Sequence, residues 1–282
     1  MKILIAADME GITGVVSWDQ VNPEHAEYNR FRKLMTNDVN AAIRGAFAAG
    51  ADEIVVTDGH AMGYNILIEE LDPRATLNSG MSATLAMVQG VENHVDGVLF
   101  VGYHARAGTP NAILDHTWSG SRVAGLSLKS AAQSEYQPFG EIGLNAALCG
   151  QFDVPVLMVS GDSAACDEAA TLLSGIETAV VKWASGRMSA ECLTPEESQQ
   201  KIQQAAYQSI THLVASQDAG GSLRPLRLEA PISLAVDFLK SEMADGAALM
   251  PGSHRNGRRI EYTADDILTV FHAFCAILAL AK

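Results

Sequence analysis

Cysteine and basic residues are both scarce in this chain, and each shortage excludes a class of protein. Lys and Arg total 19 against 33 Asp and Glu, which gives a formal net charge of -14 over 282 residues. Surfaces that bind nucleic acid or anionic membranes are basic, so neither partner is expected. The 4 cysteines include no CxxC pair, and a disulfide framework is unusual in a chain this long. Small buried thiols in a reducing cytoplasm are the simpler interpretation.

Long apolar runs and the common nucleotide and nucleophile motifs are missing as well. The amino-terminal apolar run meets Asp8 too early for a signal peptide. The longest apolar stretch, Ile267 to Ala281, contains Thr269 and His272 and is shorter than the roughly 20 residues of a membrane span. It predicts a closing helix that is buried or lies at a subunit interface. No Walker loop, dinucleotide GxGxxG or GxSxG nucleophile elbow occurs in the sequence.

Strand and helix signals alternate through about residue 185. The runs typical of strands are 2–7, 53–57, 97–102, 154–159 and 179–182, and the intervening helices are expected over 24–50, 82–91, 141–151 and 162–173. This alternation predicts an α/β fold with a mostly parallel sheet flanked by helices. A long polar helix opens near Thr194, followed by strands over 232–238 and 258–262. We therefore expect an α/β metal-binding catalytic domain over 1–190 and a smaller C-terminal α+β subdomain over 191–282.

Residues 105–138 interrupt the alternation. The segment is rich in Gly, Ser and other small residues and has no clear helical pattern. Such a long irregular stretch is either a functional lid or an excursion of short strands. Because it runs from His104 to Glu141, we expect it to cover the residues described next.

Carboxylates and imidazoles follow the ends of three predicted strands. Asp8 and Glu10 follow the first, His60 the second and His104 the third, while Glu141 opens a helix. In an open α/β sheet the ligand crevice lies at the carboxyl ends of the strands. Acidic side chains gathered there repel one another unless a cation or a shared proton lies between them. The pattern therefore predicts a metal site.

Each of these residues also has an ordinary interpretation. Glu141 could simply complement the dipole of its helix, and a histidine after a strand is commonly a surface residue. Their coincidence at one edge of the sheet favours the metal site. Asp58 is a candidate acceptor for the second ring nitrogen of His60, as metal-bound histidines usually need. Asn145, one helical turn after Glu141, could touch the site or pack beside it.

The ligand chemistry indicates the number and kind of ions. Five oxygen and nitrogen ligands exceed the needs of one tetrahedral zinc and suit two ions that share a bridging carboxylate. The set contains no thiolate, which allows zinc, manganese or cobalt. His116 lies in the irregular segment, where a histidine is usually exposed, but above a metal cleft it would be placed to move protons.

Six short motifs occur in a specific order along the chain. They are Asp-Met-Glu-Gly-Ile at 8–12, Asp-Gly-His at 58–60, Gly-Tyr-His-Ala-Arg at 102–106, Gly-Glu-Ile-Gly-Leu-Asn at 140–145, Pro-Val-Leu-Met-Val-Ser-Gly-Asp at 155–162 and Leu-Met-Pro-Gly at 249–252. Together they resemble the M55 peptidases, the DppA-like D-aminopeptidases, over essentially the whole chain. The resemblance implies a hydrolase that removes N-terminal D-amino acids from short peptides or amides. Residues 126–138 are longer or more divergent than in the family, so substrate specificity is the least transferable property.

The resemblance also implies a set of site residues and an assembly. Two zinc ions would be held by residues that match the family ligands, namely Asp8, Glu10, His60, His104 and Glu141. His116 matches the proposed catalytic histidine, as nucleophile or as base. The family forms homo-oligomers, described as a decamer of stacked pentameric rings around an internal cavity.

Two other functions remain open at this point. A metal-dependent amidase or esterase acting on non-peptide substrates would use the same residues. A non-enzymatic metal-binding ring subunit with a vestigial site is the third reading, and the complete ligand set argues against it.

Overall fold

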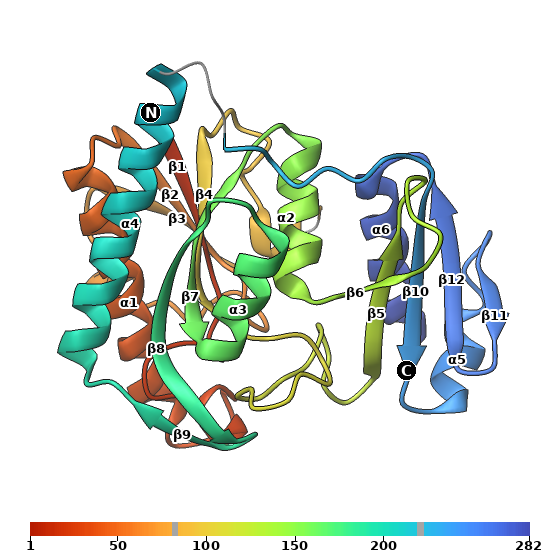
Figure 1. Ribbon diagram of the computed structural model, residues 1–282. Coiled ribbons are helices and arrows are strands. Elements are labelled where there is room, and N and C mark those ends of the chain that lie inside the picture. Colours follow the sequence, from red (N-terminus) through yellow and green to blue (C-terminus); the bar gives the residue numbers. More distant parts are fainter. Residues whose placement is uncertain (81–83, 219–222) are drawn as a thin grey trace.

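The computed structural model describes residues 1–80, 84–218 and 223–282, which form two sheets with helices around them (Figure 1). The larger sheet has 7 strands in the order β3-β2-β1-β4-β7-β8-β9. Its strands are β1 (Lys2–Ala7), β2 (Glu53–Asp58), β3 (Ala75–Asn78), β4 (Gly97–Tyr103), β7 (Val156–Asp162), β8 (Glu177–Gly186) and β9 (Ser189–Cys192). Neighbouring strands are parallel except for the β8–β9 hairpin. The predicted α/β fold with a mostly parallel sheet is confirmed.

Both faces of this sheet are buried, as is usual when helices connect parallel strands. On β1, Ile3 and Ile5 face the core shared with α1 (Tyr28–Ala48) and α4 (Pro195–Asp218). Leu4 on the same strand faces the other core. That core includes α2 (Glu141–Gln151) and α3 (Ser163–Leu172). The alternation along one strand thus explains why the chain needs helices on both sides.

The second sheet is antiparallel and has 5 strands in the order β11-β12-β10-β5-β6. Its strands are β5 (Val123–Lys129), β6 (Gln137–Phe139), β10 (Ile232–Phe238), β11 (His254–Asn256) and β12 (Arg259–Ala264). The closing helix α6 (Ile267–Leu280) packs between this sheet and α2, and the short α5 (Ser241–Ala247) contacts α6 and the strands β10 and β12 (Figure 1). The α6 residues Val270, Phe271 and Phe274 are buried, as expected for a buried helix, and the placement at a subunit interface stays a prediction.

The irregular segment 105–138 contains short strands, one of the two expected alternatives. Its second half supplies β5 and β6 to the second sheet, and its first half runs in turns past the edge of the larger sheet. Contacts between the two expected domains cross residue 190. Helix α4, beyond that residue, packs on α1, whereas β5, before it, pairs with β10. The division into domains stays a prediction.

Three further turns of 3-10 helix complete the described elements, at η1 (Trp18–Gln20), η2 (Ile68–Glu70) and η3 (Ala86–Val88). The helix expected over 82–91 falls partly outside the described residues, and its described part contains only η3. The helix expected over 162–173 is present as α3, and the Asp162 carboxylate caps it by accepting from the Ala165 N–H. Among the described residues, none of the helices combines the length and the apolar character that crossing a membrane requires.

Candidate metal centre

The predicted site residues meet where the order of the parallel strands reverses. Strands β2 and β3 lie on one side of β1 in the sheet, and β4 and β7 lie on its other side. Ligand sites in open α/β sheets form at such a switch point, at the carboxyl ends of the strands. Asp8 follows β1 and His104 follows β4, and the Asp8 Oδ2 atom lies 3.4 Å from the His104 Nε2 atom.

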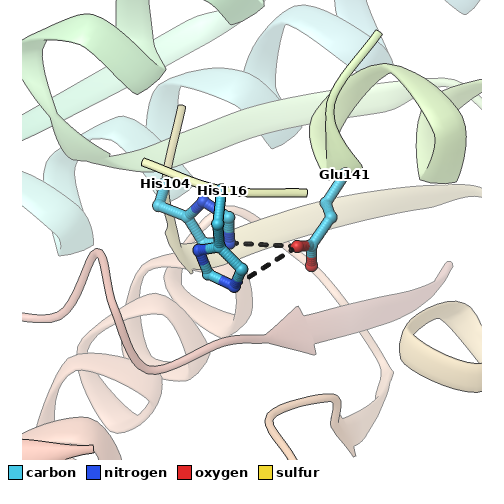
Figure 2. Close-up of side chains that lie close together, drawn as sticks. All are labelled: His104, His116 and Glu141. Carbon is cyan, nitrogen blue, oxygen red and sulfur yellow. Dashed lines mark ion pairs between the residues drawn. The ribbon is translucent and has the colours of Figure 1, made fainter. Parts of the chain in front are cut away.

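Asp8 lies between two histidine–glutamate pairs. On one side, His60 Nδ1 is 3.3 Å from Asp8 Oδ1 and 3.1 Å from Glu10 Oε2. On the other side, His104 Nε2 faces Asp8 Oδ2 and is 3.2 Å from Glu141 Oε1 (Figure 2). Each oxygen of the Asp8 carboxylate therefore faces a different pair. This is the arrangement that a bridging carboxylate between two ions requires.

Several atoms in this cluster are buried and form close charged contacts but no hydrogen bond among the described residues. Asp8 Oδ2, Glu10 Oε2 and His104 Nε2 are shielded from solvent and have no hydrogen bond within the described part of the chain. An unpaired buried polar or charged atom is costly. A divalent cation would satisfy these oxygen and nitrogen atoms, so the donor set fits zinc, manganese or cobalt.

Backbone carbonyls orient the three histidine rings. The outer ring nitrogens lie close to carbonyl oxygens, at 2.9 Å for His60 Nε2 and Val21, 3.0 Å for His104 Nδ1 and Ala105, and 2.8 Å for His116 Nδ1 and Leu114. A carbonyl only accepts, so each outer nitrogen carries the proton. In the neutral ring, the inner nitrogen then directs its lone pair at the carboxylates, as a metal ligand must.

The expected role of Asp58 is wrong. Its carboxylate accepts hydrogen bonds from the backbone N–H groups of Asn65 and Ile66 and from the Asn65 amide. These donors fasten the turn after β2, and the Val21 carbonyl takes the place beside His60. Asn145 packs behind the site, where its amide nitrogen lies 3.1 Å from the Tyr103 hydroxyl.

The carboxylates and imidazoles shift one another's acidity strongly when no cation is present. Burial and the neighbouring Glu10 carboxylate raise the pKa of Asp8 to about 7. Burial alone would lower the pKa of His60 and His104, but the adjacent carboxylates outweigh it and hold both well above the ordinary value. Protons thus take the place of a cation, and metal binding would release them.

Glycines let the two ligand-bearing loops touch through their backbones. A Cβ atom on Gly11 would lie 1.9 Å from the carbonyl oxygen of Tyr103. Gly102 has a φ of +75°, and its Cβ would lie 2.3 Å from the Asp8 carbonyl oxygen. The Gly11 N–H donates to the Gly102 carbonyl at 2.8 Å. Glycine after Asp-x-Glu and before Tyr-His is therefore a steric requirement of the site.

His116 joins the cluster from the irregular segment. Its side chain is buried, against the usual expectation for a loop histidine, and its Nε2 lies 3.8 Å from Glu10 Oε1 and 3.7 Å from Glu141 Oε1 (Figure 2). The edge of its ring meets Trp18 at 5.2 Å between centroids. Burial and the neighbouring His104 lower its pKa, so this ring favours the neutral form.

The turns that carry His116 are strained and firmly held. Asn111, Leu114 and Trp118 have φ values of 51°, 48° and 63°, which non-glycine residues rarely adopt. The Leu114 N–H donates to the Arg187 carbonyl, and the Trp118 N–H donates to Glu141 Oε1 at 2.7 Å. Strained backbone of this kind persists only where surrounding contacts hold it in place. Such strained residues are common at functional sites.

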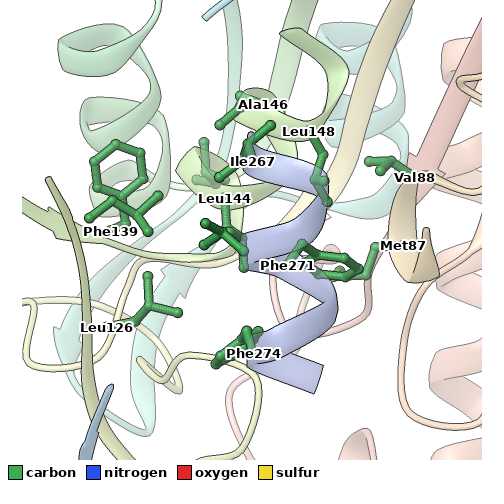
Figure 3. Packing of buried hydrophobic residues seen from close by; sticks show 14 of the residues in the cluster. Met87, Val88, Leu126, Phe139, Leu144, Ala146, Leu148, Ile267, Phe271 and Phe274 are labelled. Atoms are coloured by element: carbon green, nitrogen blue, oxygen red, sulfur yellow. The ribbon is translucent and has the colours of Figure 1, made fainter. Parts of the chain in front are cut away.

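A cavity of about 460 Å³ opens beside the cluster. Its polar side is formed by the site residues, and its apolar wall by Trp18, Met87, Trp118, Phe271 and Cys275. Phe271 comes from α6, where it packs in the core near Met87 (Figure 3). This wall was not predictable from the sequence, because its members are apolar residues far apart in the chain and no local pattern marks them.

The chain is similar to known proteins in sequence and in fold. The family profile of the M55 peptidases, described as D-aminopeptidase, matches residues 1–276. A D-aminopeptidase of Bacillus subtilis (strain 168) is 34% identical over 283 residues, covering 100% of this chain and 98% of that protein. The solved structure of a Zn-dependent D-aminopeptidase, DppA from Bacillus subtilis, described as a self-compartmentalizing protease, superposes with a TM-score of 0.91 at 32% identity. It covers 100% of this chain and 98% of its own. The chain therefore belongs to the M55 peptidase family.

Proposed function

We propose that this chain is a zinc-dependent D-aminopeptidase that removes N-terminal D-amino acids from short peptides or amides through a dinuclear site. The observation that carries the proposal is Asp8, whose two carboxylate oxygens face separate histidine–glutamate pairs. Membership of the M55 family supplies the reaction class. The preference for D-residues is supported by the names of the two relatives.

The residues divide into two ligand groups around a shared carboxylate. Glu10 and His60 would complete one ion, and His104 and Glu141 would complete the other, with Asp8 bridging. Zinc is supported by the described Zn-dependence of the similar structure, and manganese or cobalt also suit these donors. When bound, such ions polarise a carbonyl oxygen and lower the pKa of bound water toward about 7.

His116 would be the catalytic residue. Its inner nitrogen lies 3.7 and 3.8 Å from the carboxylates, beyond hydrogen-bond distance, so it is free to meet a substrate group, and its lowered pKa keeps it able to accept a proton. A base in this position can take a proton and deliver it to the leaving amine. Attack by the same nitrogen as a nucleophile is the alternative role.

The cavity suits a short substrate. At about 460 Å³ it holds a few residues, with the polar cluster at one side and the apolar wall at the other. The similar structure is described as a self-compartmentalizing protease, which supports a homo-oligomer, and we propose the decamer of stacked pentameric rings for this chain. The 4 cysteines are all free, which supports a cytoplasmic location.

Hydrolysis of matched substrates tests the proposal. Metal-free protein would be reconstituted with zinc and assayed on the p-nitroanilides of D-Ala and L-Ala, on D-Ala amide and on a D-Ala ester, with a chelator-treated control. Chelator-sensitive turnover of the D-anilide and D-amide, with little turnover of the L-form, is expected. Equal turnover of both enantiomers, or of the ester alone, would favour the second candidate, a metal-dependent amidase or esterase acting on non-peptide substrates. Zinc binding without any turnover would favour a non-enzymatic ring subunit.

A further inference from the structure

A lysine lies in the interior beneath the metal centre. Lys182, on β8, is 0% exposed. Its Nζ donates three hydrogen bonds to backbone carbonyls, at 2.7 Å to Glu10, 2.9 Å to Ile12 and 2.7 Å to Val15. All three acceptors belong to the loop that follows β1 and carries the acidic ligands.

The geometry uses the full donor capacity of the ammonium group. A lysine ammonium has three N–H donors around one nitrogen, and here each meets a different carbonyl. A buried ammonium without partners would be strongly destabilising. Because charged hydrogen bonds are roughly twice as strong as neutral ones, the Lys182 ammonium group holds the loop firmly in this conformation.

The held loop fixes the direction of one proposed ligand. The Glu10 carbonyl points to Lys182, while the carboxylate of the same residue reaches His60. Neighbouring contacts fix the rest of the loop, since the Gly11 N–H donates to Gly102 and the Thr13 backbone and hydroxyl groups donate to Asp38. The Ile12 carbonyl also accepts from the Val15 N–H at 3.1 Å, whereas Lys182 is the donor to the Glu10 and Val15 carbonyls within the described part of the chain.

We propose that Lys182 is a positioning residue of the metal centre, whose ammonium aims the Glu10 carboxylate by holding the carbonyls of Glu10, Ile12 and Val15. The inference rests on the metal site proposed above and deepens it. It predicts that the affinity of the site for a divalent cation depends on a residue that touches no cation. Partners that orient ligands from outside commonly change metal affinity about 10- to 100-fold.

Lys182→Met tests the proposal, because methionine has a similar length and volume but donates no hydrogen bond. Metal-free wild type and variant would be titrated with Co²⁺ and followed by visible absorption. We expect the variant to bind about 10- to 100-fold more weakly and to show an altered Co²⁺ spectrum. The matched control is Ile260→Ala, which opens a cavity at a buried position on β12 of the second sheet and should bind Co²⁺ like wild type.

Three outcomes would overturn the proposal. The first is a folded Lys182→Met protein with wild-type affinity and spectrum. The second is an equal loss in Ile260→Ala, which would make the effect one of general destabilisation. The third is a wild type that binds no Co²⁺, which would remove the proposed metal site and Lys182's role with it, whereas the first two leave that site intact.

Lys182→Arg keeps the test decisive if the methionine variant does not fold. Arginine retains the charge, but its planar guanidinium cannot place three N–H groups around one nitrogen. Weaker Co²⁺ binding and an altered spectrum are expected again, and wild-type behaviour in the arginine variant would overturn the proposal.

Discussion

The imidazole rings of His104 and His116 lie stacked, with their centroids 4.0 Å apart and their planes 11° apart. Two adjacent imidazoles resist carrying a charge together, because like charges at this distance repel. The carboxylates of Glu141 and Asp8 hold the pKa of His104 up against its burial, whereas burial and His104 lower the pKa of His116. The stack thus gives two identical side chains different properties, which suits one to bind an ion and the other to accept a proton.

Replacing His116 separates catalysis from metal binding. His116→Ala should retain the zinc content of wild type and lose about 10²- to 10⁴-fold in kcat, the usual contribution of a proton-transferring group. Zinc per chain measured by elemental analysis and steady-state turnover of D-Ala p-nitroanilide check both halves. The loss of one zinc equivalent would make His116 a ligand instead, since it can also share an ion with His104 and Glu141.

Asp8 and His60 should differ in how much metal their loss removes. Asp8→Asn weakens the residue that both ligand groups share, so both ions should be lost or bound much more weakly. His60→Ala removes a ligand from one group and should leave about one ion per chain, because a catalytic zinc ion is held by about three protein ligands and loses affinity when one is removed. Zinc-to-protein ratios after dialysis against a weak chelator would decide this. Equal ratios in the two variants would contradict the bridging role.

The structure brings the residues predicted as ligands together because each follows a strand or opens a helix. Parallel strands that end at one edge bring Asp8, His60 and His104 together whatever the details of the loops. The partner of His60 was not predictable, because a backbone carbonyl such as that of Val21 leaves no mark in the sequence. His116 was a candidate because it lies in the irregular segment, and the resemblance to the M55 peptidases favoured it further, since no local pattern distinguishes it from a surface histidine.

Long-range packing accounts for what the sequence did not reveal. β5 pairs with β10 across more than a hundred residues, and alternation along either strand does not identify its neighbour. Lys182 follows three apolar residues on β8, where a lysine suggests the exposed end of a strand. Its three carbonyl partners lie near the start of the chain, so its burial follows from the fold and not from the local pattern.

Arg187, which does not line the cavity, should affect kcat by positioning His116. Its guanidinium donates to the Asp115 carboxylate at 2.5 Å and to the Asp115 carbonyl at 2.7 Å, and it lies over the Trp18 ring. Asp115 precedes His116, and Trp18 contacts the His116 ring. Arg187→Ala should therefore lower kcat about 10- to 100-fold through misplacement of His116, with zinc content unchanged.

Arg74→Ala is the matched control for Arg187. Arg74 also pairs with an aspartate, Asp72, and lies over an aromatic ring, that of Phe47. It precedes β3 and therefore lies at the amino ends of the parallel strands, whereas the metal centre lies at their carboxyl ends. Wild-type kcat is expected in this variant. Wild-type kcat in Arg187→Ala as well would show that the contacts to Asp115 and Trp18 do not position His116.

Asp38 should make the stability of the protein depend on pH. Burial raises the pKa of this carboxyl from 3.8 to about 6, although hydrogen bonds from Thr13 partly oppose the shift. Between these values the unfolded chain has released the proton and the folded chain still holds it. The resulting stabilisation is complete below about pH 4 and is lost as the pH rises through about 6.

Asp38→Asn isolates this effect, because asparagine stays neutral in both states. Since one pKa unit corresponds to about 1.4 kcal/mol, the unfolding free energy of the variant relative to wild type should rise by about 2–3 kcal/mol between pH 4 and pH 7. Urea unfolding of the metal-free proteins at several pH values measures this difference, and Asp265→Asn, at an exposed carboxylate, controls for the change in net charge. A difference that stays constant over this range would mean that Asp38 is already ionised in the folded protein below pH 4, with the charge of Lys182 and the Thr13 donors outweighing its burial.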